Sequence, residues 1–178
     1  MSSQRQRILD NLAARLLLIQ PGHIFTLPSG PYECQSTINK VQPWRKNPYS
    51  LGELPAIAWR DAVAKMDSTD FGLTSGYKLT VAMAVYQAGT TAAAVARQAL
   101  ADMVAAIGSD TRFNGLAVLT RMLKTEFEMT QGGDISAAAR LWIEIAYIPS
   151  YQPDETHGER ELTSDGETLT SDGTTLEW

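Results

Sequence analysis

The chain has 178 residues, of which 44% are hydrophobic and 20% are charged, a composition typical of a globular domain with a full core. The longest early apolar cluster, residues 16–19, is too short to cross a bilayer, and its helical setting argues against a signal peptide. A single cysteine, Cys34, excludes an intrachain disulfide and fits a reducing compartment.

The charge is unevenly distributed along the chain. Residues 153–178 hold eight of the 20 acidic residues and only one of the 15 basic residues, so this segment has a net charge of −7. Subtracting it from the total of −5 leaves residues 1–152 at about +2. The acidic character therefore belongs to the C-terminal segment, and the body has no strongly basic field of the kind that binds nucleic acid.

The N-terminal stretch predicts an amphipathic helix over residues 3–19. Ile8, Leu12, Leu16 and Ile19 recur at helical spacing, and Pro21-Gly22 ends the pattern. Residues 22–55 contain five prolines and predict two short strands, near 23–27 and 36–42, followed by an exposed loop, PWRKNPYSLGELP.

Two strands are predicted next. PAIAWRDAVAKM favours a strand, although its alanines would also suit a helix. The alternation in residues 76–87 is the clearest strand signal in the chain. Its second face carries Ala82 and Ala84, which would let another group approach closely. The opposite face of that strand is formed by Tyr77, Leu79, Val81, Met83 and Val85.

The period then changes to that of a helix. TTAAAVARQALADMVAAIG has an alanine-rich stripe suited to close packing on a sheet, with Thr90 or Thr91 as the cap and Gly108 as a glycine stop. Arg97, Gln98 and Asp102 are expected to face water.

The last part of the body reads as a long β-hairpin. Residues 123–129 and 139–148 alternate in polarity, and QGGD at 131–134 has the glycines that a reversal needs. The order of elements predicts an α+β domain over residues 1–152, with a mostly antiparallel sheet and an N-terminal helix and one crossing helix packed on one face. An acidic extended arm, residues 153–178, follows.

No catalytic, metal or cofactor site is expected. His23 and His157 are far apart in sequence, and no HExxH, CxxC, phosphate-binding loop or GxSxG motif is present. Cys34 has no evident activating histidine, so we interpret it as a buried or loop residue.

Two features could instead be contact surfaces. In PWRKNPYS, Trp44 and Tyr49 flank Arg45 and Lys46, which suits a nucleic-acid backbone, a protein hot spot or merely a loop with a packed Trp. The outward face of the last two strands could be solvated or an oligomer interface, because Trp142 lies among charges there. Those charged residues are Arg121, Lys124, Glu126, Glu128, Arg140 and Glu144.

The C-terminal arm contains a tandem repeat, TSDGETL at 163–169 and TSDGTTL at 170–176. Its Asp-Gly pairs between β-prone residues are typical of turns between short strands. The segment is either an acidic linker or an arm that adds to a neighbouring subunit or to another assembly component. In the second case Leu162, Leu169, Leu176 and Trp178 would be its apolar contacts.

The body resembles the tail terminator (minor tail protein U-like) family of long-tailed bacteriophages. The resemblance covers about residues 5–148 and lies in RQRILDNLAARL, LPAIAWRD, YKLTVAMAVYQ, the helix AAAVARQALADMVAAIG and a last strand ending in IEIAYI. The family has no catalytic motif to transfer. The PWRKNPYS loop and the acidic repeat have no counterpart in its pattern.

This resemblance implies a non-enzymatic virion protein that assembles in the host cytoplasm as a homo-hexameric ring. Such a ring caps the head-proximal end of the tail tube, contacts the major tail tube protein and the head–tail connector protein, and lets DNA pass through its lumen without sequence-specific binding. Another neck component, such as a connector or head-completion protein, and a nucleic-acid-binding module using Trp44, Arg45 and Lys46 remain alternatives.

Overall fold

The computed structural model describes residues 3–47, 49–65, 76–130 and 136–148, together with three two-residue strands near the C-terminus. Its contacts divide the chain into two compact units, Ser2–Ile148 and a smaller one comprising Pro149–Trp178 and Met1. Each unit is described separately below.

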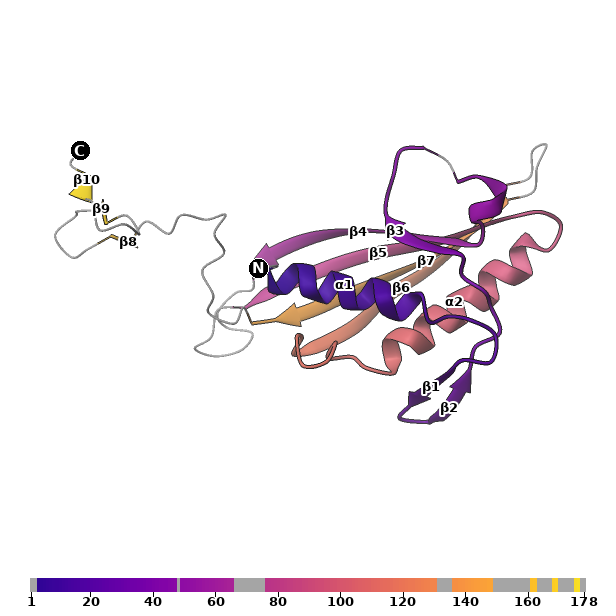
Figure 1. The fold of residues 1–178 in the computed structure, drawn as a ribbon, viewed down its shortest axis with the longest axis horizontal. Coiled ribbons are helices and arrows are strands. Elements are labelled where there is room, and N and C mark those ends of the chain that lie inside the picture. The colour runs from indigo at the N-terminus through magenta and orange to yellow at the C-terminus, as the bar shows by residue number, and fades with distance from the viewer. Residues whose placement is uncertain are drawn as a thin grey trace. The chain divides into compact units, whose positions relative to one another are not determined.

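The larger unit is built on a five-stranded sheet (Figure 1). Only β3 and β4 run parallel; every other neighbouring pair is antiparallel, as the predicted α+β class with a mostly antiparallel sheet requires. In spatial order the strands are β3 (Lys40–Pro43), β4 (Ala56–Lys65), β5 (Tyr77–Ala88), β7 (Ser136–Tyr147) and β6 (Leu119–Thr130).

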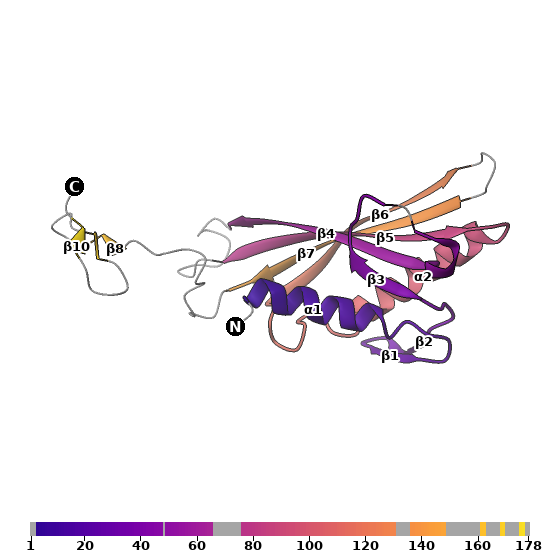
Figure 2. The ribbon, with the colours of Figure 1, turned by 45° about the horizontal axis from the view of Figure 1, so that its top comes forward.

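Two helices, α1 (Gln4–Leu16) and α2 (Ala92–Gly108), cover one face of this sheet (Figure 2). The side chain of Ser3 caps α1 by accepting a hydrogen bond from the Gln6 N–H at 3.2 Å. The predicted helical stripe forms its buried side, which consists of Ile8, Leu9, Leu12 and Leu16. Burying one face of each helix against the sheet forms a two-layer core.

The alternation in β5 and β7 is confirmed by burial. Leu79, Val81 and Val85 are fully buried and lie opposite Ile145, Ile143 and Ala139 of β7. Strand β6 contains a bulge that the sequence pattern did not indicate, because the register shifts between Met122 and Lys124. The bulge leaves Leu123 without a partner in β7. From Lys124 onwards the residues of β6 again alternate between the two faces of the sheet.

The packing of α2 explains its alanines. Ala92, Ala96 and Ala99 are fully buried, so the helix backbone approaches β5 and β7 closely. The helix ends at Gly108, as predicted, but this glycine is not a left-handed cap: it is the last helical residue, and Ser109 caps the helix with a right-handed backbone (φ −69°). Thr91 is the N-cap residue, but its side chain makes no capping hydrogen bond.

The expectation that Asp102 faces water is also wrong. Its carboxylate is fully buried and accepts hydrogen bonds from the Tyr32 hydroxyl at 2.8 Å and the Ser36 N–H at 2.8 Å. Gln98 donates a third from the same helix at 3.2 Å. A buried carboxylate is tolerated because these donors replace its water.

The proline-rich region contains one more strand than predicted. β1 (Ile24–Leu27) and β2 (Gly30–Glu33) form a separate antiparallel hairpin, and Gly30 at φ +123° makes the turn possible. The second predicted strand, 36–42, begins later than expected, because β3 starts at Lys40. Cys34, directly after the hairpin, is fully buried.

In the smaller unit the structure describes three strands that pair in order, β8 (Glu161–Leu162), β9 (Thr168–Leu169) and β10 (Thr175–Leu176). Both pairings are antiparallel. Leu162 and the repeat residues Leu169 and Leu176 each lie in one of these strands. Trp178 lies outside the described residues, as does the predicted hairpin turn at 131–134.

Candidate interaction surface

Within the described part of the larger unit, no helix covers the opposite face of the sheet, which we call the bare face (Figure 2). Cross-strand pairing places Ala58, Ala84 and Arg140 in one row across this face, and Arg60, Ala82 and Trp142 in the next. The pairing continues into β6, where Lys124 lies opposite Trp142 and Glu126 opposite Arg140. Residues from four strands therefore share one surface.

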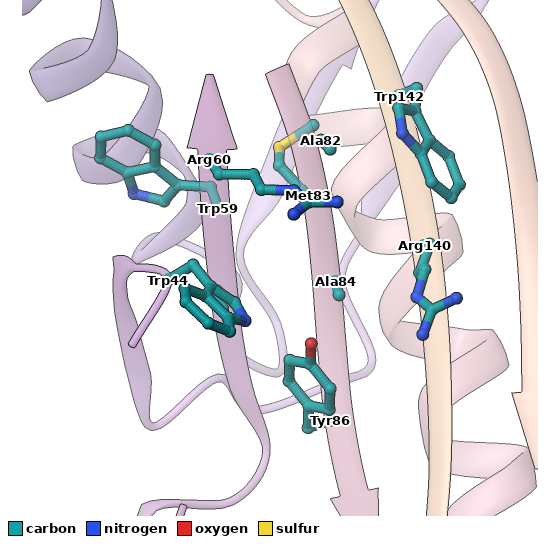
Figure 3. Close-up of a pocket in the computed structure, with 10 residues that line it drawn as sticks. Trp44, Trp59, Arg60, Ala82, Met83, Ala84, Tyr86, Arg140 and Trp142 are labelled. Carbon is teal, nitrogen blue, oxygen red and sulfur yellow. The ribbon is translucent and has the colours of Figure 1, made fainter. Parts of the chain in front are cut away.

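A shallow depression of about 270 Å³ lies on this bare face. Its floor is made of Ala58, Ala82 and Ala84, whose short side chains leave room above the strands. The larger side chains that surround the floor are Trp44, Arg60, Tyr86, Arg140 and Trp142 (Figure 3).

The aromatic groups of the depression remain partly accessible. Trp44 is 57% exposed, although its backbone N–H donates to the Trp59 carbonyl at 2.7 Å and so fixes where its side chain begins. The Nζ of Lys124 lies 4.2 Å from the centre of the Trp142 ring, a cation–π contact. Aromatic groups held in place but not buried are typical of binding surfaces.

Two guanidinium groups lie beside these rings. Arg140 bonds to Glu128 at 2.6 Å and approaches Glu126 at 4.0 Å, so it is already paired on one side. Arg60 is exposed and extends from β4 across the alanine floor towards β5 (Figure 3). On β4, β5, β6 and β7, the described bare face has more cationic side chains than carboxylates. The cations are Arg60, Lys78, Arg121, Lys124 and Arg140, against Glu126, Glu128 and Glu144.

The loop before β4 is held by its own ion pairs. Arg45 bonds to Glu53 at 2.5 Å and its guanidinium carbon lies 4.4 Å from the centre of the Tyr49 ring. The Arg45 hydrogen bond, followed by those from Lys40 and the Ser50 N–H, keeps the pKa of Glu53 well below its usual range. The Tyr49 ring lies 5.7 Å from that of Tyr86, which connects the loop to the bare face.

The structure separates the predicted contact residues into groups. Trp44 and Trp142, which are far apart in sequence, meet at the same depression. Arg45 and Tyr49 stack on each other within the loop, and Lys46 is exposed but does not line the depression. Leu162, Leu169 and Leu176 belong to the other unit.

Arg60 and Tyr86 are lining residues that the sequence prediction did not include. The signal for both was present, because strand alternation places Arg60 beside Ala58 and Tyr86 beside Ala84. The sequence did not give the strand order, which places β5 between β4 and β7.

Among the described residues, no three His, Cys, Asp or Glu side chains gather as a metal site. His23 packs edge-on against Phe25 with 4.6 Å between ring centres. No helix in the described ranges is long and apolar enough to cross a membrane. A scan against protein-family models and a search of curated proteins found no match to this chain.

Proposed function

We propose that this chain is a structural virion protein, a ring-forming tail terminator that ends polymerisation of a phage tail tube and joins it to the head. The proposal combines the family resemblance of residues 5–148 with one structural observation, the bare sheet face and its aromatic depression. Aromatic and arginine side chains around a small-residue floor have the composition of a protein–protein hot spot. The function would be performed by contact surfaces and not by a reaction.

In this proposal the bare face contacts an adjoining component of the particle. Its first candidate is a segment of the major tail tube protein that reaches from the last tube ring along the wall of the terminator ring, because that last ring must be covered for growth to stop. The head–tail connector protein would contact another surface of the ring, and DNA would pass through the lumen. A ring requires each subunit to present two different, complementary patches, as heterologous assembly demands.

The nucleic-acid alternative has less support from the loop. Arg45, which would be a main phosphate contact in a nucleic-acid-binding loop, is already bonded to Glu53 and stacked on Tyr49. Binding through phosphates would fall steeply with salt concentration, so a salt titration separates this reading from a protein contact.

The test is to mix purified protein with polymerising major tail protein and to measure tube lengths by electron microscopy. We expect the protein at one tube end and a narrower length distribution. Trp142→Ala should weaken tube binding at least tenfold, roughly 1.4 kcal/mol, as expected for a hot-spot residue. Leu51→Ala is the matched control, because Leu51 is 81% exposed but lies outside the depression.

Unchanged tube lengths at saturating protein would refute the tail-terminator role. Binding to the isolated head portal in place of the tube would assign the chain to another part of the neck.

A further inference from the structure

The five-stranded sheet ends in two unlike free edges. At one end, β6 pairs only with β7, so one side of its backbone has no strand partner in the described chain. At the other end, β3 covers β4 from Ala56 to Trp59, and among the described strands the remainder of β4, from Arg60 to Lys65, pairs only with β5. Unpaired N–H and C=O groups along such edges can pair with another strand.

On β6 the charged side chains lie on the bare face, whereas Met122, Phe127 and Met129 lie on the helix-covered face and are nevertheless exposed. Every residue from 121 to 129 is exposed. Natural sheets protect long edges with charges or covering loops, and the charges of β6 leave the apolar side chains on its other face exposed, which indicates a binding surface there. The exposed apolar side chains of β6 are Leu119, Met122, Leu123, Phe127 and Met129.

The occupant that fits this edge best is the free part of β4 in a second copy of the chain. Three successive antiparallel pairings make β4 and β6 run in opposite directions. Rotating one copy about a ring axis along the strands keeps these directions, so β6 of one copy would lie antiparallel to β4 of the next. The sheet would then continue from subunit to subunit.

We propose that neighbouring subunits join by antiparallel pairing of β6 with Arg60–Lys65 of β4, with Phe127 of one copy opposite Val63 of the next. Both side chains lie on the helix-covered face, and each is 37% exposed in the single chain. This inference rests on the proposed ring and identifies its subunit contact.

Two further features favour this register. If Phe127 lies opposite Val63 in an antiparallel pair, Thr130 lies opposite Arg60. Thr130 is the last residue of β6, and Arg60 is the first residue of β4 beyond the part covered by β3. The strand would therefore fill the free edge without meeting β3. On the bare face, Glu128 would lie diagonally across from Arg60, within reach of a long side chain.

Cysteine crosslinking tests this contact directly. Within one chain β4 and β6 are separated by β5 and β7, about 14 Å apart at sheet spacing, so Val63→Cys and Phe127→Cys cannot bridge in the same copy. The native Cys34 is fully buried. The full-length double variant should form, under mild oxidation, a reducible ladder of covalent oligomers whose largest member gives the ring size.

The single variants decide the geometry. Val63→Cys mixed with Phe127→Cys should give one covalent dimer, at least tenfold faster than Val63→Cys mixed with the control Leu51→Cys. Dimers formed equally fast by Phe127→Cys alone would show a symmetric β6–β6 contact and overturn the proposal. Absence of any crosslink above the Leu51→Cys level would overturn it too.

A second measurement needs no cysteine. Phe127→Lys should lower the oligomer fraction in native mass spectrometry at least tenfold, while Leu51→Lys leaves it unchanged. Equal effects of the two variants would count against the contact. If the double cysteine variant forms the crosslinked ladder but the protein does not bind tubes, the subunit contact is supported and the tail-terminator role is rejected. Failure of the subunit contact and failure of the tail-terminator role are therefore distinguishable.

Discussion

Asp102 connects three separate parts of the chain through its carboxylate. It lies on α2, accepts from the Tyr32 hydroxyl at 2.8 Å at the end of the β1–β2 hairpin, and accepts from the Ser36 N–H at 2.8 Å in the segment that leads to β3. The hairpin has no place in the main sheet. Its attachment to the body therefore depends in part on this one buried side chain.

We expect Asp102→Ala to lower the free energy of unfolding by about 2–4 kcal/mol, because it leaves buried donors without an acceptor. Urea denaturation measures the change. Asp10→Ala is the control, since Asp10 is exposed on α1 and its carboxylate accepts a hydrogen bond from Gln6 at 2.7 Å. A loss for Asp102→Ala no larger than that for Asp10→Ala would contradict the structural role.

The cluster formed by Asp102, Tyr32 and Cys34 should make the stability of the protein sensitive to alkaline pH. Burial, with the hydrogen bond to Asp102, raises the pKa of Tyr32 to about 12, and burial, with the charge of Asp102, raises the pKa of Cys34 to about 11. Because both pKa values are higher in the folded state, the stability that they contribute is complete below about pH 9 and is lost towards pH 12.

Urea midpoints measured from pH 8 to pH 12 should therefore fall across this range. Tyr32→Phe removes one of the two groups and should flatten the fall. An identical slope in both proteins would count against a contribution from Tyr32.

At the level of elements, the alanine face of α2 sets its distance from the sheet. Ala96 is fully buried in the core, whereas Ala94 on the same helix is exposed. We expect Ala96→Leu to destabilise the protein by about 1–3 kcal/mol, because extra methylenes in a packed core force strain. Ala94→Leu should change the free energy of unfolding by less than about 0.5 kcal/mol. Thermal unfolding of the two variants compares them, and similar melting points would contradict close packing at Ala96.

The success of sequence-based prediction differed between elements for physical reasons. In β5 and β7, alternating burial and long strand length agree, so range and inward face were both predictable. β2 and β3 were harder, because Pro31 and Pro43 fall within strands of only four residues each. Prolines usually argue against a strand, except at edges such as these.

The interaction surface was predictable only in part. Trp44 and Trp142 were identified as contact candidates from their local context alone. Their meeting at one depression depends on strand order, which arises from contacts between distant segments. Asp102 was misplaced for the same reason, because Tyr32, Gln35 and Ser36, which donate hydrogen bonds to it, lie far away in sequence.

At the level of the whole molecule, the body and the acidic segment should be separable. All residues of the main core lie between Ile8 and Tyr147. A chain ending at residue 152 should therefore keep its fold, with a melting temperature within about 4 °C of the full chain, equivalent to less than about 1 kcal/mol. Circular dichroism and thermal unfolding measure this. A melting temperature far lower would show that the acidic segment contributes to the stability of the body.

The same truncation tests the assembly role predicted for the repeat. If the arm adds to a neighbouring subunit or to the tube, removing it should weaken assembly, measured by native mass spectrometry and electron microscopy. Replacing Leu162, Leu169 and Leu176 by serine in the full chain keeps the acidic charge and should have the same effect. Unchanged assembly of both proteins would identify the segment as a linker.

The arrangement of tryptophans around the alanine floor also gives the protein an intrinsic optical probe. Trp44 and Trp142 border the depression on its accessible side, while Trp59 is only 8% exposed and can serve as an internal reference. An occupant on the bare face would move the first two indoles from water into an apolar environment and shift their emission to the blue. Acrylamide should quench the fluorescence of Trp44 and Trp142 in the free protein. When an occupant covers the surface, acrylamide should no longer reach these two rings. Occupation of this face could thus be followed in real time by its fluorescence, without an attached dye.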